Sequence, residues 1–350
     1  MTLEDLILQA RAQDASDLHL THDQPPALRK LGQLVPGQPL APGEAEQMIL
    51  NVMSPAQRAL LDSGKDADFS LTTPDGLRQR VNIYRQQGHL CAAVRLLRDG
   101  IPTIDELGLP PAVHQLAAKP RGLVLVTGPT GSGKSTTLAA MIQQINATRR
   151  AHIITIEDPI EYVHKPQLSV VHQREVGRDV GNFASALRSA LREDPDVILV
   201  GEMRDFETIT AALTAAETGH LVFSTLHTIG AAHTVDRIVN ACPAEMQQEV
   251  RIQLAGVLQG CITQELVPLS DGTGRVAAME VLMGTAAALN LIRDNKSYQL
   301  PSLMQTGAAL GMQTLNLNLA KLVQTGRVSY GDALTRASDP EELNGYLNMR

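Results

Sequence analysis

The sequence predicts an α/β protein with a small α+β domain first, a larger domain built on a parallel sheet next, and a helical region last. Up to about residue 98, short strands of alternating apolar and polar residues mix with helices. From about residue 112, continuous apolar strands alternate with helices, which is typical of a parallel sheet covered on both faces. The length of 350 residues agrees with several domains, because a single core rarely grows beyond about 250–300 residues.

The first domain is predicted from a helix over residues 3–12 and a strand around Leu18 and Leu20, which the prolines at 25–26 end. A strand or hairpin around Gly32 follows. The remaining elements are a helix from about Glu44 to Met53, a second helix over 54–64, and three strands across 67–97 joined at 74–76 and 86–89. We expect domain limits at 1–98 for this domain, 99–111 for a Pro- and Gly-rich linker, 112–285 for the larger domain and 286–350 for the helical end.

Four apolar strands define the larger domain: LVLVT, HIITIED, VILVGE and HLVFSTLH. No internal repeat interrupts this order. After about residue 286 the pattern becomes mostly helical, through ALNLIRDNKSYQLPSLMQTGAALGMQTLNLNLAKLVQTG. The strands therefore fix where ligands are expected, because open α/β sheets bind them outside the carboxyl ends of their strands.

Composition excludes several classes of protein. The net charge is −7 and aromatic residues make up 3%, with no Trp, which speaks against a surface that grips nucleic acid through phosphates and stacked bases. The three cysteines, Cys91, Cys242 and Cys261, form no CxxC pair, so a structural zinc framework is not expected and a reducing compartment is. The start MTLEDLILQA is not a secretory signal, and apolar runs such as 197–200 are too short for a membrane span. We expect a cytoplasmic protein.

The stretch GPTGSGKS fits the phosphate-binding pattern GxxxxGK[ST] at every position, after a strand and before a helix. Its glycines allow backbone N–H groups to turn toward phosphates, and the helix start adds a favourable dipole. Lys134 is expected to reach the β- and γ-phosphates, and Ser135 to hold Mg²⁺. The predicted nucleotide-binding residues are Gly128, Thr130, Gly131, Ser132, Gly133, Lys134, Ser135 and Thr136.

A nucleotide-hydrolysing site also needs carboxylates near the metal and the attacking water. The end of one strand offers Glu157, Asp158 and Glu161, and the end of another offers Glu202. In the common pattern an acid ends the second strand itself, but here Gly201 holds that place. For each acid the alternative is a solvated or helix-capping role, and it stays most open for Asp158 and Glu161.

Histidines and arginines supply further candidates. His220 and His227 stand at the two ends of one strand and are not expected to bind one metal together; either has a structural alternative. An arginine from another domain or subunit often offsets the charge that develops in phosphoryl transfer. The candidates are Arg78, Arg80, Arg95 and Arg275, with solvated strand faces as the alternative.

Five stretches together resemble the secretion-type ATPases, and within them the PilT family of type IV pilus retraction ATPases. They are ASDLHL, the Walker A stretch GPTGSGKST, the acidic stretch ITIEDPIEY, the Walker B region ALREDPDVILVGEMRD and the histidine stretch TAAETGHLVFSTLHT. Walker A alone is unspecific, but the four nucleotide-site motifs in this order and spacing are specific to the family.

The resemblance implies a PAS-like N-terminal domain, a RecA-like P-loop motor and a homo-hexameric ring that hydrolyses ATP with Mg²⁺. It implies that Glu157 polarises the attacking water and that Glu202, with Ser135, holds Mg²⁺. Arg80 and Arg95 would approach the phosphates. His227, together with Arg275 and Thr218, would report the state of the subunit interface.

The retraction subtype rests on the C-terminal signature AIRNLIRE, for which this chain has AALNLIRD at 287–294. Leu289 stands where arginine is expected and Asp294 where glutamate is. Assembly members usually carry an extra N-terminal domain and a four-cysteine metal motif, and this sequence shows neither. The resemblance thus implies a motor for pilus retraction, twitching motility and DNA uptake. It would act on an inner-membrane platform protein and lie at the inner face of the membrane only through that partner, without touching nucleic acid.

Three alternatives remain open from the sequence. One is a type IV pilus assembly or type II secretion ATPase, which shares the nucleotide-site motifs. Another is a DNA-translocating motor, against which the acidic balance speaks. The last is a ring that binds ATP without turnover, which the complete set of Lys134, Ser135, Glu157 and Glu202 disfavours.

Overall fold

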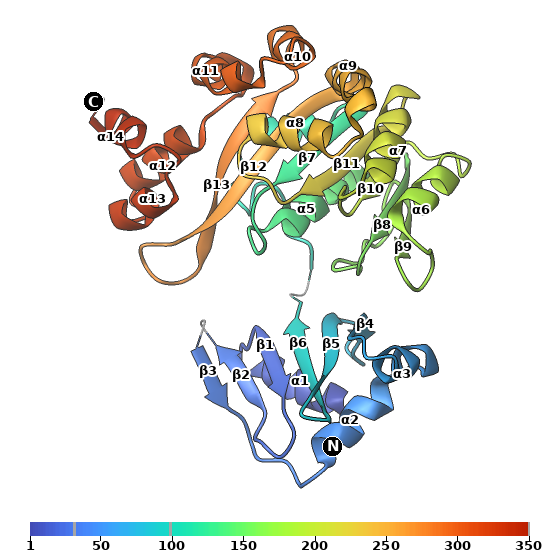
Figure 1. Cartoon of the computed structure of the whole chain (residues 1–350). Helices are drawn as coiled ribbons and strands as arrows, with labels where there is room; N and C mark the ends of the chain where they lie inside the picture. Colours follow the sequence, from blue (N-terminus) through green and yellow to red (C-terminus); the bar gives the residue numbers. More distant parts are fainter. Residues whose placement is uncertain (31–32, 98–99, 349–350) are drawn as a thin grey trace. The chain divides into compact units, whose positions relative to one another are not determined.

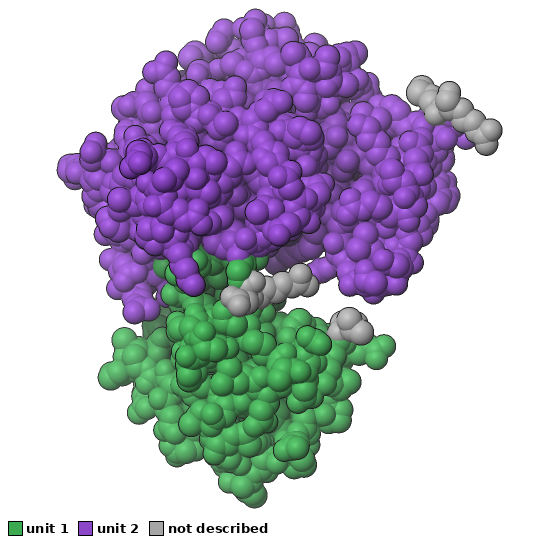
Figure 2. Space-filling model, turned by 180° about the vertical axis from the view of Figure 1, so that it is seen from behind, with its two compact units in different colours: residues 1–100, 159–163 green, residues 101–158, 164–350 purple. Residues whose placement is uncertain are grey.

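The structure is a computed structural model of the chain that describes residues 1–30, 33–97 and 100–348. It divides into two compact units (Figure 2): unit 1 is residues 1–100 with 159–163, and unit 2 is residues 101–158 with 164–350. The predicted boundary at residues 98 and 99 and the predicted turn at Gly32 lie outside the described residues. Within the described ranges, no helix is both long and apolar enough to cross a membrane.

Unit 1 is a six-stranded antiparallel sheet in the order β3-β2-β1-β6-β5-β4, with three helices (Figure 1). Its elements are α1 (Leu3–Ala12), β1 (Asp17–Leu20), β2 (Ala27–Lys30), β3 (Gln33–Pro36), α2 (Glu44–Val52), α3 (Pro55–Asp62), β4 (Ala67–Thr72), β5 (Arg78–Gln86) and β6 (His89–Leu96). Helix α1 begins where Thr2 and Asp5 cap each other reciprocally. The predicted elements of this region are confirmed, and their apolar faces share one core.

Unit 2 contains a seven-stranded sheet in the order β13-β12-β7-β11-β10-β8-β9 (Figure 1). The four strands predicted from apolar runs are β7 (Gly122–Thr127), β8 (His152–Glu157), β10 (Val197–Val200) and β11 (Leu221–Leu226). They pair with one another in parallel, as predicted. Their crossover helices are α5 (Lys134–Thr148), α6 (Phe183–Ala190) and α7 (Phe206–Glu217). The chain crosses the sheet one way through α5 and back through α6 and α7, so right-handed crossovers put them on opposite faces.

Three further strands widen this sheet beyond the prediction. Strand β9 (Val170–Glu175) adds in parallel beside β8, and β12 (Leu258–Pro268) adds in parallel beside β7. Strand β13 (Arg275–Met283) pairs antiparallel with β12 and forms the other edge. The sheet is therefore mostly parallel with one antiparallel edge strand.

Helices complete unit 2. Before β7 stands α4 (Pro111–Ala117), and between β11 and β12 stand α8 (Ala231–Asn240) and α9 (Gln247–Val257). The predicted helical end is confirmed as α10 (Ala286–Arg293), α11 (Leu300–Thr306), α12 (Leu315–Gln324), α13 (Tyr330–Arg336) and α14 (Pro340–Asn348). Residues of α12, α13 and α14 share a separate apolar cluster with the ends of β12 and β13.

Candidate nucleotide-binding and catalytic site

The predicted phosphate-binding loop (the phosphate loop, residues 128–133) joins the end of β7 to the start of α5. Gly128 has φ of 138°, and a Cβ added there would lie 2.2 Å from the carbonyl oxygen of Gln264. Gly133 precedes α5 with φ of 88°. Only glycine combines such a backbone with so close an approach. The sequence pattern thus has a steric cause, and the loop brings backbone N–H groups to the start of a 15-residue helix, where anions are favoured.

Lys134 folds over this loop. Its side chain is 8% exposed, and its Nζ donates hydrogen bonds of 2.9 Å to the carbonyl oxygens of Gly128 and Pro129. Ser132 is buried, and its Oγ makes no hydrogen bond within the described part of the chain. Ser135 and Thr130 are exposed. The loop therefore combines one ammonium group, accessible hydroxyls and a buried hydroxyl that can still donate.

Gln264 of β12 holds the loop through a hydrogen bond, and the sequence did not predict this contact. Its Nε2 donates to the Ser132 carbonyl oxygen over 2.6 Å, and its side chain is 1% exposed. No sequence signal singles it out, because the contact joins residues 132 positions apart.

Four threonines form a second feature that sequence reasoning missed. Thr127, the last residue of β7, lies 2.8 Å from Thr263 of β12 between hydroxyl oxygens, and Thr234 of α8 donates to Thr127 over 3.5 Å. Thr228 and Thr234 are 2.7 Å apart. These hydroxyls connect the residue before the phosphate loop to the residue after His227.

Glu157 is the last residue of β8 and is half-buried. Its Oε1 accepts hydrogen bonds from the hydroxyl of Thr155 at 2.6 Å and the amide of Gln173 at 3.2 Å. Gln173 also accepts a bond of 2.8 Å from the backbone N–H of His164. The Thr155 hydroxyl and the Gln173 amide thus orient this carboxylate oxygen.

Glu202 lies two residues beyond β10, and its side chain is 15% exposed. Its Oε1 is 2.6 Å from Nε of Arg204, and its Oε2 is 3.3 Å from Nε2 of His227. The N–H of Gly201 donates to Ile156 of β8, which continues the sheet pairing past the strand end. Both carboxylate oxygens therefore face cationic or proton-donating groups.

These groups all lie at the carboxyl ends of the parallel strands. Strands β8, β10, β11 and β7 are neighbours and parallel, with Leu226 opposite Thr127 and Val200 opposite Ile156. The phosphate loop and the predicted Glu157, Glu202 and His227 all follow carboxyl ends, where α/β sheets bind ligands. A pocket of about 280 Å³ opens beyond the ends of β10 and β11, lined by Glu202, Met203, Arg204, Thr225, Leu226, His227, Thr228 and Arg237.

Other candidates lie elsewhere. His220 stands at the opposite end of β11 from His227, and its Nδ1 is 2.9 Å from the carbonyl oxygen of Ala215 and 3.2 Å from the hydroxyl of Thr218. These local contacts fit its structural alternative. Arg275 is the exposed first residue of β13, Asp158 is exposed, and Glu161 belongs to the segment grouped with unit 1.

The predicted arginines Arg80 and Arg95 belong to unit 1 and lie directly opposite each other on β5 and β6. Arg80 pairs with Asp68 at 2.7 Å, and Arg95 pairs with Asp17 at 3.4 Å. Arg78 bonds the hydroxyl of Ser70. Two guanidinium groups thus share one face of this sheet.

Known proteins are similar to this chain over most of its length. A family described as "Type II/IV secretion system protein" matches residues 2–326. The type IV pilus retraction ATPase PilT of Pseudomonas aeruginosa is 49% identical over 345 residues, which cover 98% of this chain and all of that protein. PilU, a type IV pilus ATPase of the same organism, is 39% identical over 351 residues, covering 100% and 92%. A crystal structure of the pilus retraction motor PilT with bound ADP superimposes with a TM-score of 0.90, at 48% identity over 99% of both chains.

Proposed function

The chain belongs to the family of type II/IV secretion system proteins, and we propose that it is an ATP-hydrolysing motor that powers type IV pilus retraction. One observation carries this proposal: the phosphate loop, two carboxylates and His227 meet at one sheet edge in a chain 49% identical, from end to end, to a retraction ATPase. Assembly and secretion ATPases match shorter parts of this chain.

We assign residues 112–285 a RecA-like motor fold, residues 286–350 a helical region, residues 1–98 a PAS-like fold and residues 99–111 the role of a linker. The support is the run of parallel strands with the phosphate loop directly after β7. Chains of this family work as hexameric rings, and we propose a homo-hexamer here.

ATP is the proposed ligand of residues 128 and 130–136. Backbone N–H groups of the loop surround the phosphates, and the buried Ser132 hydroxyl has a donor to offer. The Lys134 ammonium, now bonded to two loop carbonyls, can turn the same positive charge to the β- and γ-phosphates. Thr130 in the loop and Thr136 near the start of α5 complete the predicted set.

Mg²⁺ fits the donors present, because the Ser135 hydroxyl and the Glu202 carboxylate are the oxygen ligands that this ion prefers. Bound there, the ion would neutralise charge on the phosphates. Glu202 supplies a carboxylate that is only 15% exposed, so its charge is weakly screened. Arg204 and His227 orient that carboxylate from two sides.

Glu157 is the proposed group that polarises the attacking water, supported by the hydrogen bonds that fix its carboxylate. The water oxygen bonds to the γ-phosphorus, the bond to the ADP oxygen breaks, and Glu157 accepts the water's proton. Arg80 and Arg95 are proposed to balance charge on the phosphates. His227, with Thr218 and Arg275, is proposed to report the state of the subunit interface.

In the cell, the motor would act from the cytoplasm on an inner-membrane platform protein, so that pilin returns to the membrane. It would reach the membrane only through that partner and would not contact nucleic acid. The acidic balance of the chain, at −7 overall, supports the last point.

The chemical test compares ATP hydrolysis by the purified wild type, Glu202→Gln and Glu207→Gln. Glu207 is the matched control, because it is an exposed acid five residues further on. We expect Glu202→Gln to lower the rate about 100-fold or more, and Glu207→Gln to keep it. Equal rates for all three proteins would remove Glu202 from the site.

The cellular test images labelled pili in a strain that lacks the gene and carries one of the same three forms. We expect pili that extend but do not retract, with retraction restored by the wild type and Glu207→Gln only. A strain without any pili would favour an assembly ATPase. Normal pili would overturn the retraction function, and strong stimulation of ATP hydrolysis by DNA would favour a translocating motor.

A further inference from the structure

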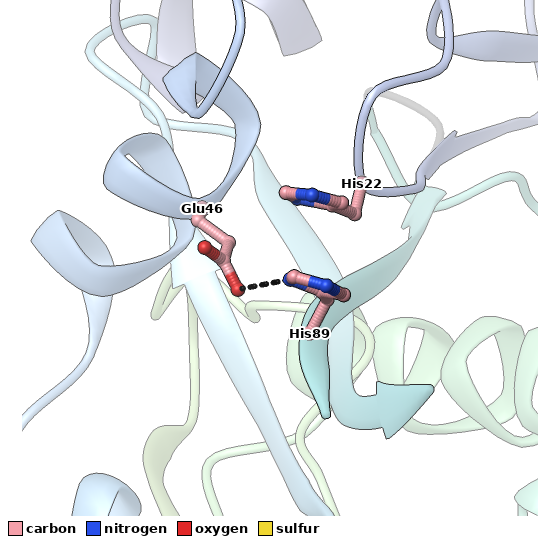
Figure 3. Close-up of side chains that lie close together, drawn as sticks. All are labelled: His22, Glu46 and His89. Carbon is pink, nitrogen blue, oxygen red and sulfur yellow. Dashed lines mark ion pairs between the residues drawn. The ribbon is translucent and has the colours of Figure 1, made fainter. Parts of the chain in front are cut away.

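Two histidines and one glutamate converge at the surface of unit 1 (Figure 3). His22 lies just after β1, Glu46 lies in the first turn of α2, and His89 begins β6. One ligand atom from each side chain lies within 4.8 Å of the other two. Among the residues that the structure describes, this is the one group of three or more His, Cys, Asp or Glu side chains that gathers so closely.

The backbone under each of these side chains is anchored in the core of unit 1. Leu20, Met48 and Leu90 lie one or two residues from the three positions, and each is at most 5% exposed. All three belong to the same apolar cluster. The side chains therefore project from three elements whose relative positions are fixed by shared packing, while the side chain of His89 remains 45% exposed.

The carboxylate of Glu46 is oriented by a backbone hydrogen bond. Its Oε1 accepts a hydrogen bond of 2.9 Å from the backbone N–H of Leu90 and lies 3.7 Å from Nδ1 of His89. The bond from Leu90, followed by the nearby imidazoles of His89 and His22, lowers the pKa of Glu46. Such a backbone bond to a carboxylate is the kind of outer contact that orients metal ligands.

The two imidazole rings are stacked, with centroids 3.5 Å apart and planes 7° from parallel. Two imidazole nitrogens and one carboxylate oxygen are a donor set that three-ligand zinc sites use, with water at the fourth position. At Zn–N distances of about 2.0–2.1 Å, tetrahedral ligand atoms lie about 3.3 Å apart. To reach that spacing from the present one, the two rings have to turn out of their stack.

We propose that His22, Glu46 and His89 bind one divalent transition-metal ion, for which zinc is the probe. The ion would join the loop after β1, helix α2 and the β5–β6 hairpin across the surface of unit 1. Because imidazole must be deprotonated to bind a metal, affinity falls as the solution is acidified. The site is separate from the phosphate loop, so the proposal does not depend on the motor function.

The experiment uses the full-length protein, stripped of metal with a chelator and free of nucleotide. Zn²⁺ binding is measured by equilibrium dialysis with elemental analysis, for the wild type, Glu46→Gln and His89→Gln. Glu46→Gln keeps an oxygen that can accept the Leu90 bond but removes the charge, so loss of binding is not a loss of folding. We expect one Zn²⁺ per chain in the wild type and at least 10-fold weaker binding in both variants.

The control variant is His152→Gln, which removes a histidine from another close pair, since Nε2 of His152 is 2.9 Å from Nδ1 of His172 in unit 2. We expect this variant to bind zinc like the wild type. Co²⁺ provides a second readout, because visible absorption bands of a bound Co²⁺ should appear in the wild type and disappear in His89→Gln. No saturable binding by the wild type, wild-type affinity in Glu46→Gln and His89→Gln, or loss of binding only in His152→Gln would each overturn the proposal.

Discussion

Replacing His164 by glutamine should change how the stability of the protein depends on pH. The side chain of His164 is 6% exposed, and its Nδ1 is 3.3 Å from the amide oxygen of Gln143. The backbone N–H of the same residue donates to Gln173. Burial lowers the pKa of this imidazole from 6.5 to about 4, because the charged form loses its solvation.

The sign and size of the effect follow from that shift. Between pH 6.5 and pH 4 the unfolded chain binds a proton at His164 that the folded chain does not bind, so the free energy of unfolding falls as pH falls through this window. Between pH 7.5 and pH 5 the loss from this one group is about 2 kcal/mol, and it reaches about 3 kcal/mol below pH 4. Above pH 6.5 the group contributes no pH dependence.

Urea unfolding followed by circular dichroism, at one protein concentration, measures the effect at pH 7.5 and pH 5. At pH 7.5 we expect His164→Gln to be less stable, by about 1–2 kcal/mol, from lost packing. At pH 5 this difference in the free energy of unfolding should vanish or change sign. The variant has no imidazole at position 164, so it does not lose stability there as the pH falls. Other groups titrate in both proteins and cancel in the difference. Equal losses between the two pH values in wild type and variant would refute the reasoning.

Substitutions at four further positions test the surroundings of the phosphate loop. Gly128→Ala places a Cβ 2.2 Å from a carbonyl oxygen and should abolish ATP binding in a calorimetric titration. Gly131→Ala meets no atom within 4 Å and should lower the free energy of unfolding by only about 1–2 kcal/mol. Gln264→Leu removes the amide donor to the loop and should lower stability by about 1–3 kcal/mol and raise KM for ATP in a steady-state assay. Thr234→Val keeps the shape of the buried side chain but removes its hydroxyl, and it should lower stability by about 1 kcal/mol in urea unfolding.

The sequence predicted the strands whose side chains are mostly apolar. Strands β7, β8, β10 and β11 are buried almost completely, so their composition alone marks them. Strand β12 escaped prediction because it buries Thr263, Gln264 and Glu265 as well. Their polar atoms have partners far along the chain, such as Ser132 and Arg336, and no local pattern reports such contacts. Strand β9 escaped because it is a polar edge strand with few buried positions.

In the candidate site, too, some features follow from the local sequence and others only from the fold. Motif spacing predicted the loop and the acids, because phosphate binding imposes its glycines and lysine locally. Spacing could not predict that Arg204 turns back onto Glu202 at 2.6 Å. Both residues lie in the same stretch GEMRD, but the direction of the arginine depends on the loop after β10. The threonine hydroxyls are likewise joined only by the fold, across as many as 136 positions.

The threonine contacts connect the strand that leads into the phosphate loop to the segment that follows His227. Thr127 ends the strand that leads into the phosphate loop, and Thr228 directly follows His227, which faces Glu202. The hydroxyl of Thr234 lies between them, at 2.7 Å from Thr228 and 3.5 Å from Thr127. A displacement of the loop after β7 therefore changes a buried hydrogen bond whose other end supports the segment of His227. Because unmade hydrogen bonds between buried groups are unfavourable, these threonine contacts favour the relative positions of the two segments that the structure shows.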